Sequence, residues 1–147
     1  MDEFDFDYMN FLNGINSKSN SINNYSNDNI SSKVIDPSVG FSRGNLFNNL
    51  YDQYKNYKPV MINPQSEKDA LLNQWQQYNF AVVELNLYLD TYPNDVNALK
   101  LLNNYNNILK QITKKYESFY GPICITDVGG ASNYDWLNGD WPWEVSR

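Results

Sequence analysis

Residues 80–95 read FAVVELNLYLDTYPND, and this stretch decides the fold expected for the chain. Its apolar residues recur every three or four positions as far as Leu89, which is the period of one face of an α-helix. Pro93 has no N–H and disfavours helical backbone at Tyr92, so the helix should end near residue 90. The Asn-Asp pair that follows can cap the start of another helix. The stretch therefore predicts a helix, a tight turn and a second helix.

The same period continues on both sides of this stretch, over residues 66–120. Ser66, with an acid three positions later, resembles a capping box, and Gly121-Pro122 should stop the second helix. So short a connection makes the helices antiparallel neighbours, with arms of roughly 25 residues or ~37 Å. The predicted fold is therefore all-α, an antiparallel αα-hairpin. Its expected seam consists of Leu71, Trp75, Tyr78, Val82, Leu85 and Leu89 on the first helix and Ala98, Leu102, Tyr105, Leu109, Ile112, Tyr116 and Phe119 on the second.

The first helix carries a second apolar stripe, formed by Phe80, Val83 and Leu87, which lies roughly opposite the seam. One partner helix covers only one face, so a further element is expected to cover this stripe. That element is either a short helix of the same chain or another protein. Glu84 lies beside the stripe, where an interhelical hydrogen bond or a partner contact is a simpler interpretation than a catalytic role.

The chain before the hairpin divides into two segments. Residues 1–38 are rich in Asn and Ser and poor in apolar residues, which predicts disorder. Their acidic and aromatic start is either a solvated tail or a hook that orders on a partner. Residues 39–60 predict an amphipathic helix over 45–57, which ends before Pro59 and is too short to be stable without docking. The residues expected on or beside its apolar face include Leu46, Phe47, Leu50 and Tyr51.

The C-terminal segment, residues 121–147, carries three of the four tryptophans of the chain. So short a tail cannot bury three indoles by itself. The tail either folds back over the hairpin, or anchors a partner surface as Trp and Tyr do at interface hot spots, or stacks on sugars. The aromatic residues concerned are Tyr134, Trp136, Trp141 and Trp143.

Composition excludes several classes of function. The chain has 11 Lys+Arg against 17 Asp+Glu, a net charge of −6, no histidine and a single cysteine. A disulfide framework, a Cys/His zinc site and Ser-His-Asp or Cys-His catalysis are therefore impossible. So acidic a chain is a poor binder of nucleic acid or anionic membranes. No signal peptide or membrane span is visible, so we expect a soluble intracellular protein. Because no catalytic or metal-ligating set of residues is visible either, we expect no enzymatic activity, cofactor or metal.

At residues 80–95 the chain resembles the CotJB-type spore coat proteins of endospore-forming bacteria. The resemblance continues through Ala98-Leu99 and Gly121-Pro122, and it closes with Asn133-Tyr134 and the Trp-Pro-Trp-Glu element at 141–144. It covers about residues 70–145. Upstream, residues 44–51, GNLFNNLY, resemble an element of CotJA-type coat proteins. If so, the chain is a natural fusion, in which the 45–57 helix could cover the second stripe.

The resemblance implies a structural scaffold of the inner spore coat, made in the mother-cell cytoplasm. It also implies a manganese-catalase-like coat protein and a CotJA-like protein or segment as partners; the chain could also form homo-oligomers. An alternative is a general helical adaptor of the tetratricopeptide type, although one helix pair is too few for a solenoid. The candidate interface residues are Leu46, Phe47, Leu50, Tyr51, Phe80, Val83, Glu84, Leu87, Tyr134, Trp136, Trp141 and Trp143.

Overall fold

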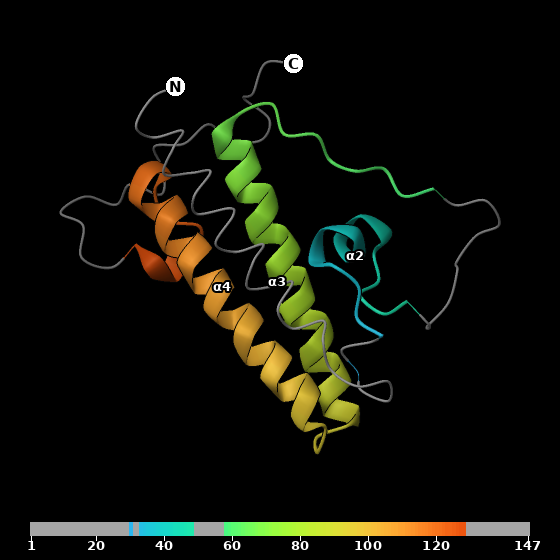
Figure 1. The fold of residues 1–147 in the computed structure, drawn as a ribbon. Coiled ribbons are helices and arrows are strands. Elements are labelled where there is room, and N and C mark those ends of the chain that lie inside the picture. The colour runs from blue at the N-terminus through green and yellow to red at the C-terminus, as the bar shows by residue number, and fades with distance from the viewer. Residues whose placement is uncertain (1–29, 31–32, 49–57, 129–147) are drawn as a thin grey trace.

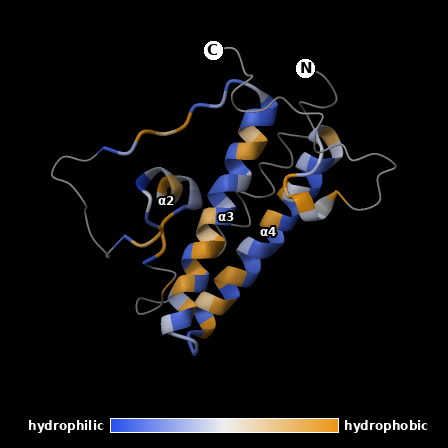
Figure 2. Ribbon diagram, turned by 180° about the vertical axis from the view of Figure 1, so that it is seen from behind, coloured by the Kyte–Doolittle hydropathy of each residue, from blue (hydrophilic) through white to orange (hydrophobic). Residues whose placement is uncertain are grey.

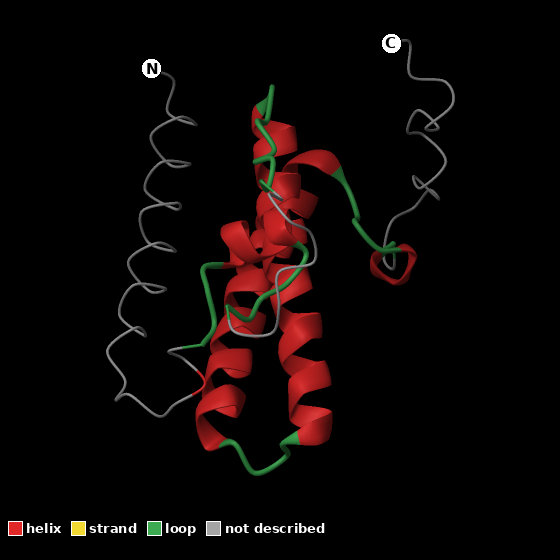
Figure 3. Ribbon diagram, turned by 90° about the vertical axis from the view of Figure 1, so that its right-hand side faces the viewer, coloured by secondary structure: helices red, strands yellow, loops and turns green. Residues whose placement is uncertain are grey.

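The computed structural model describes residue 30, residues 33–48 and residues 58–128. These residues form α2 (Pro37–Arg43), α3 (Glu67–Thr91), α4 (Val96–Tyr120) and a short 3₁₀ helix, η2 (Ile125–Asp127). The long helices α3 and α4 pack side by side and antiparallel, and α2 packs on α3 (Figure 1). No strand occurs in this part of the chain (Figure 3). The prediction of an all-α helical hairpin is confirmed.

The ends of α3 follow from local capping. The side chain of Ser66 accepts a hydrogen bond from the backbone N–H of Asp69 at 3.1 Å, as the capping pattern predicts. At the other end, the N–H of Tyr92 still reaches the carbonyl oxygen of Tyr88 at 2.9 Å. Pro93 cannot make the next bond of this kind. The helix therefore ends at Thr91, as expected.

The ends of α4 are equally local. Asp95 is its N-cap, and one carboxylate oxygen accepts from the N–H groups of Asn97 and Ala98, each at 3.0 Å. Gly121 follows the last helical residue with a φ of +89°, a conformation that side chains with a Cβ rarely adopt. The two caps fix the length of α4 at the residues that the sequence predicted.

The core lies mainly along the seam between α3 and α4. Tyr78 and Tyr105 meet edge to face there, with ring centroids 5.6 Å apart, and Trp75 donates a hydrogen bond to the Thr113 hydroxyl at 2.9 Å. Most seam positions are buried as predicted. The buried hydrophobic residues of the two helices are Leu71, Tyr78, Ala81, Val82, Leu85, Ala98, Leu101, Leu102, Tyr105, Ile108, Ile112 and Tyr116.

On α4 the seam prediction is wrong at one position and incomplete at two others. Phe119 is 54% exposed, because it lies in the last turn of α4, beside the start of α3, where no further turn of α3 covers it. Leu101 and Ile108 are buried although they were not assigned to the seam. They widen the apolar face of α4 beyond a strict coiled-coil seam, as is usual for a helix in a globular core.

The short helix lies at residues 37–43, whereas the sequence analysis placed it at 45–57. Asp36 caps it by accepting from the N–H of Ser38 at 2.8 Å, and Gly44 ends it with a φ of +71°. Residues 45–48 are not helical, and residues 49–57 lie outside the described residues. The predicted disorder also ends earlier than residue 38, since Ile30 is already buried. The rest of that prediction, residues 1–29, lies outside the described residues.

Candidate functional site

Residues 33–48 form a strap that crosses the outer face of α3. Its two ends pair through an antiparallel bridge between Val34 and Phe47. Two backbone hydrogen bonds flank the bridge, from Ile35 to Leu46 at 3.0 Å and from Asn48 to Lys33 at 2.9 Å. The helix α2 is the connection between these ends. The strap is therefore a closed unit, and it presents one side to α3.

The strap is fixed to α3 by apolar and polar contacts. Leu46 is fully buried, and its backbone N–H donates to the carboxylate of Glu84 at 3.4 Å. Phe41 of α2 packs edge-on against Phe80, with ring centroids 5.9 Å apart. Phe47 stacks on Tyr88 at 5.4 Å. These contacts join residues about 40 positions apart, so tertiary packing, and not local propensity, holds the strap in place.

The second apolar stripe of α3 is only partly covered by the strap. Phe80 is half-buried against Phe41. Val83 and Leu87 remain 48% and 59% exposed. Hydrophobic residues are concentrated on the half of α3 nearest the turn (Figure 2). The described part of the predicted 45–57 helix, residues 45–48, is not helical and leaves Val83 and Leu87 accessible, while the rest of that prediction lies outside the described residues.

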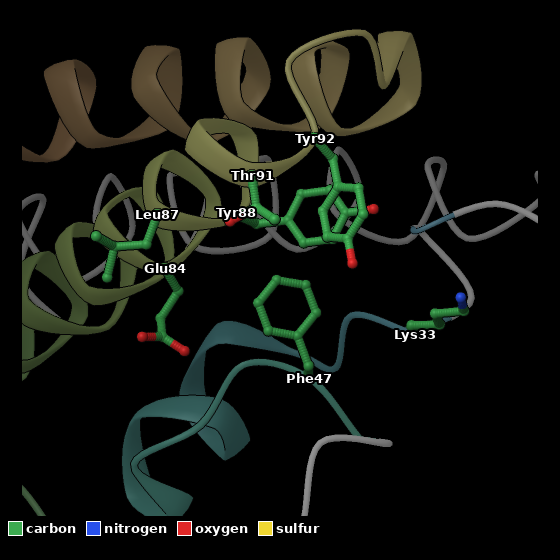
Figure 4. Close-up of a pocket in the computed structure, with 7 residues that line it drawn as sticks. All are labelled: Lys33, Phe47, Glu84, Leu87, Tyr88, Thr91 and Tyr92. Carbon is green, nitrogen blue, oxygen red and sulfur yellow. The ribbon is translucent and has the colours of Figure 1, made fainter.

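A groove of about 490 Å³ lies between the strap and the last two turns of α3. This volume falls within the range of ligand pockets and side-chain docking grooves. In Figure 4, the aromatic rings of Phe47, Tyr88 and Tyr92 surround the opening, while Glu84 and Lys33 lie at opposite ends. We call it the strap groove. Its lining residues are Lys33, Phe47, Glu84, Leu87, Tyr88, Thr91 and Tyr92.

The chemistry of the strap groove suits binding. Burial, and then the hydrogen bond to Asp95, raise the pKa of the Tyr88 phenol. Like any tyrosine hydroxyl it is protonated near neutral pH, and it donates to the Asp95 carboxylate at 3.1 Å. The Tyr92 ring packs against it, with centroids 4.7 Å apart. The groove thus offers aromatic and aliphatic surface with one acid and one base at its ends.

The described residues hold no candidate metal centre and no candidate membrane-spanning helix. No group of three or more His, Cys, Asp or Glu side chains there is placed to hold a metal ion. Among the helices of residues 30, 33–48 and 58–128, none is both long and apolar enough to cross a bilayer.

The structure separates the candidate interface residues into three groups. Leu46 and Phe47 belong to the strap and are buried against α3, so they hold the strap in place, and Phe47 also lines the groove. Val83 and Leu87 are exposed, and Phe80 and Glu84 are half-buried. The remaining candidates, which stay predictions, lie outside the described residues: Leu50, Tyr51, Tyr134, Trp136, Trp141 and Trp143.

Four groove residues were not singled out from the sequence. Tyr88 and Tyr92 could have been found, because aromatic residues four apart at the end of a helix stack on one face. Thr91 carries no comparable signal. Lys33 could not have been found, because only the Val34–Phe47 bridge brings it to α3.

One family of known proteins matches this chain. The model of the CotJB protein family matches residues 69–144, which is 76 of the 147 residues. The match begins in the first turn of α3, spans the turn and α4, and ends within the tryptophan-rich tail. It does not include residues 44–51, so nothing in it supports the CotJA-like segment. No curated protein and no solved structure matches the chain.

Proposed function

Since the chain belongs to the CotJB family and is therefore a spore coat-associated protein, we propose that it is a non-enzymatic scaffold of the inner coat. In this proposal it is made in the mother cell and binds a manganese-catalase-like coat protein. The redox chemistry of manganese then belongs to the partner, and this chain supplies position and contact surface.

The observation that supports a scaffold is the uncovered half of the second stripe. Val83 and Leu87 lie one turn apart on α3, beside a folded strap that leaves them accessible. Burying the exposed half of both side chains contributes on the order of 2 kcal/mol. A binding free energy of that size changes the dissociation constant roughly 30-fold. At suitable protein concentrations, such a change decides whether the partner is mostly bound or mostly free.

Surface of this kind on a rigid helix suits a protein partner better than a small substrate. Both residues lie in the C-terminal half of α3, whose seam side is buried against α4. Their positions are thus fixed before binding, so little ordering entropy opposes the contact. Aliphatic side chains on a rigid helix face are the anchors of helix-in-groove recognition.

Co-expression with the manganese-catalase-like coat protein tests the proposal. Light scattering after size exclusion should show a joint peak for the wild-type pair. The double variant Val83→Ser/Leu87→Ser should weaken it by about tenfold or more. Val96→Ser/Leu99→Ser is the matched control, because it removes similar exposed apolar surface from α4 and should leave the joint peak unchanged.

The C-terminal tail is tested in the same assay. Deleting residues 134–147 should abolish the joint peak and leave the helical circular dichroism signal intact, if the tryptophans anchor the partner. A truncated chain that still binds would assign the contact to α3 alone. Two separate peaks for the wild-type proteins at every concentration would overturn the proposal.

A further inference from the structure

An extended apolar segment precedes α3. Residues 58–63, here called the arm, are not helical, and Val60, Met61 and Ile62 are 83%, 55% and 53% exposed. Figure 1 shows the arm leaving the top of α3 and running away from the helices. Within the described part of the chain, the backbone between Pro59 and Ile62 makes no hydrogen bond. Three consecutive aliphatic side chains and an unpaired backbone are therefore free to meet another surface.

The strap groove has apolar walls and a carboxylate that the exposed residues of the arm could contact. Its walls are Phe47, Leu87 and Tyr88, which are apolar, and it has space for side chains. The Glu84 carboxylate at its end receives only one long hydrogen bond from the described residues, at 3.4 Å from the Leu46 nitrogen. Lys58, two positions before Val60, brings a cation into reach of such a carboxylate. Arm and groove are thus complementary in both apolar character and charge.

The apolar side chains of the arm cannot reach Leu87 of their own chain. Ile62 lies four residues before Ser66, the N-cap of α3, and so stays within ~14 Å of it at ~3.4 Å per residue. Leu87 lies 21 residues beyond Ser66, or ~31 Å along the helix at ~1.5 Å per residue. Closing this distance would require unwinding α3. The groove that the arm fits is therefore that of another molecule.

We propose that the arm of one copy of this chain lies in the strap groove of a second copy. Because arm and groove are at opposite ends of α3, two copies with antiparallel α3 helices make both contacts at once. The exchange is then reciprocal and gives a closed two-fold dimer. Val60 and Ile62 insert beside Leu87, and Lys58 pairs with the partner copy's Glu84. The arm covers Leu87 and leaves Val83, which does not line the groove, accessible to a coat partner. Because the contact needs no other coat protein, its failure leaves the proposed function untouched.

Complementation between two variants of the full-length protein tests the exchange. The wild type should dissociate from dimer to monomer on dilution in light scattering. An arm variant, Val60→Asp/Ile62→Asp, and a groove variant, Leu87→Asp, should each be monomeric under conditions where the wild type is dimeric. An equimolar mixture of the two should regain a dimer, because one intact arm then meets one intact groove. Val96→Asp, at a similarly exposed apolar position outside both elements, should leave the dimer unchanged.

Charge-reversal variants test whether Lys58 of the arm faces Glu84 of the groove. Lys58→Glu and Glu84→Lys should each weaken the dimer about tenfold, and the double variant should restore it. A monomeric wild type at all concentrations would overturn the proposal. So would an arm-dependent dimer that survives Leu87→Asp, since the arms would then pair with each other. A mixture of the two variants that stays monomeric would likewise refute arm-in-groove exchange.

Discussion

Replacing Asp95 with alanine tests how the turn holds α3 and α4 together. One oxygen of this carboxylate accepts from the N–H groups of Asn97 and Ala98, and the other accepts from the Tyr88 hydroxyl. The first set of bonds caps α4, while the second reaches back to the last turns of α3. A single side chain thus connects both helices across a turn that also contains Pro93.

The loss of stability expected for Asp95→Ala is the sum of the contributions of these two roles. Loss of an N-cap destabilises a helix by about 1 kcal/mol, within a range of roughly 0.5–2. The bond from Tyr88 goes to a charged acceptor but is only partly buried, so we assign it about 1 kcal/mol, below the range for fully buried cases. Asp95→Ala should therefore lower the free energy of unfolding by about 2 kcal/mol. Asp95→Asn keeps a good capping group and should cost about half as much.

Urea unfolding followed by circular dichroism near neutral pH measures these differences. A double-mutant cycle with Tyr88→Phe isolates the cross-turn bond, and its coupling energy should be about 1 kcal/mol. The slope of the transition should stay constant, because neither change alters the surface exposed on unfolding. A coupling energy near zero would show that hydrogen bonds to water stabilise the Tyr88 hydroxyl as much as its bond to Asp95 does. A loss below about 0.5 kcal/mol for Asp95→Ala would refute both assigned roles.

Three further predictions concern the core, the strap and alkaline pH. Leu85→Ala, at a fully buried seam position, should lower stability by about 2–5 kcal/mol in the same urea assay. Gly40→Ala would place its Cβ 3.2 Å from the Leu46 backbone. The resulting crowding should outweigh the ~1 kcal/mol gain in helix propensity, so the strap should be cleaved faster in limited proteolysis. Burial raises the pKa of Tyr105 above its ordinary value of 10.0, so the folded state keeps a proton that the unfolded state loses. Stability should therefore be intact below about pH 10 and fall above it, and Tyr105→Phe should flatten that fall in urea titrations.

The helical hairpin was predictable because its signals are local. Ser66, Pro93, Asp95 and Gly121 each act on backbone groups within a few residues, so their effect does not depend on the rest of the fold. The seam follows from the same period of three and four. The exception, Phe119, depends on where the neighbouring helix begins, and this position cannot be read from α4 itself.

The helix α2 was not predicted, although the chain carries local signals for it. The apolar spacing from Leu46 onward fits a helix, whereas Asp36-Pro37 and Gly44 mark the start and end of a shorter one before it. In the structure Leu46 packs within 3.1 Å of the position where a Gly40 side chain would begin, so close packing against α2 decides its conformation. Such packing is visible only once the fold is known.

The two long helices differ in how much of their apolar surface the rest of the fold covers. α4 is apolar on one broad face, and that face is buried against α3, so substitutions there change folding. α3 is apolar on two faces, and the strap covers only the Phe80 end of the second. In a protein of this size, a helix buried on both sides would have been the more stable arrangement, since apolar surface stabilises when it leaves water. Leaving Val83 and Leu87 accessible costs some of that stability, and it leaves apolar surface exposed on a rigid helix, as the proposed scaffold function requires. Substitutions on this outer face should therefore change assembly while leaving unfolding nearly unchanged.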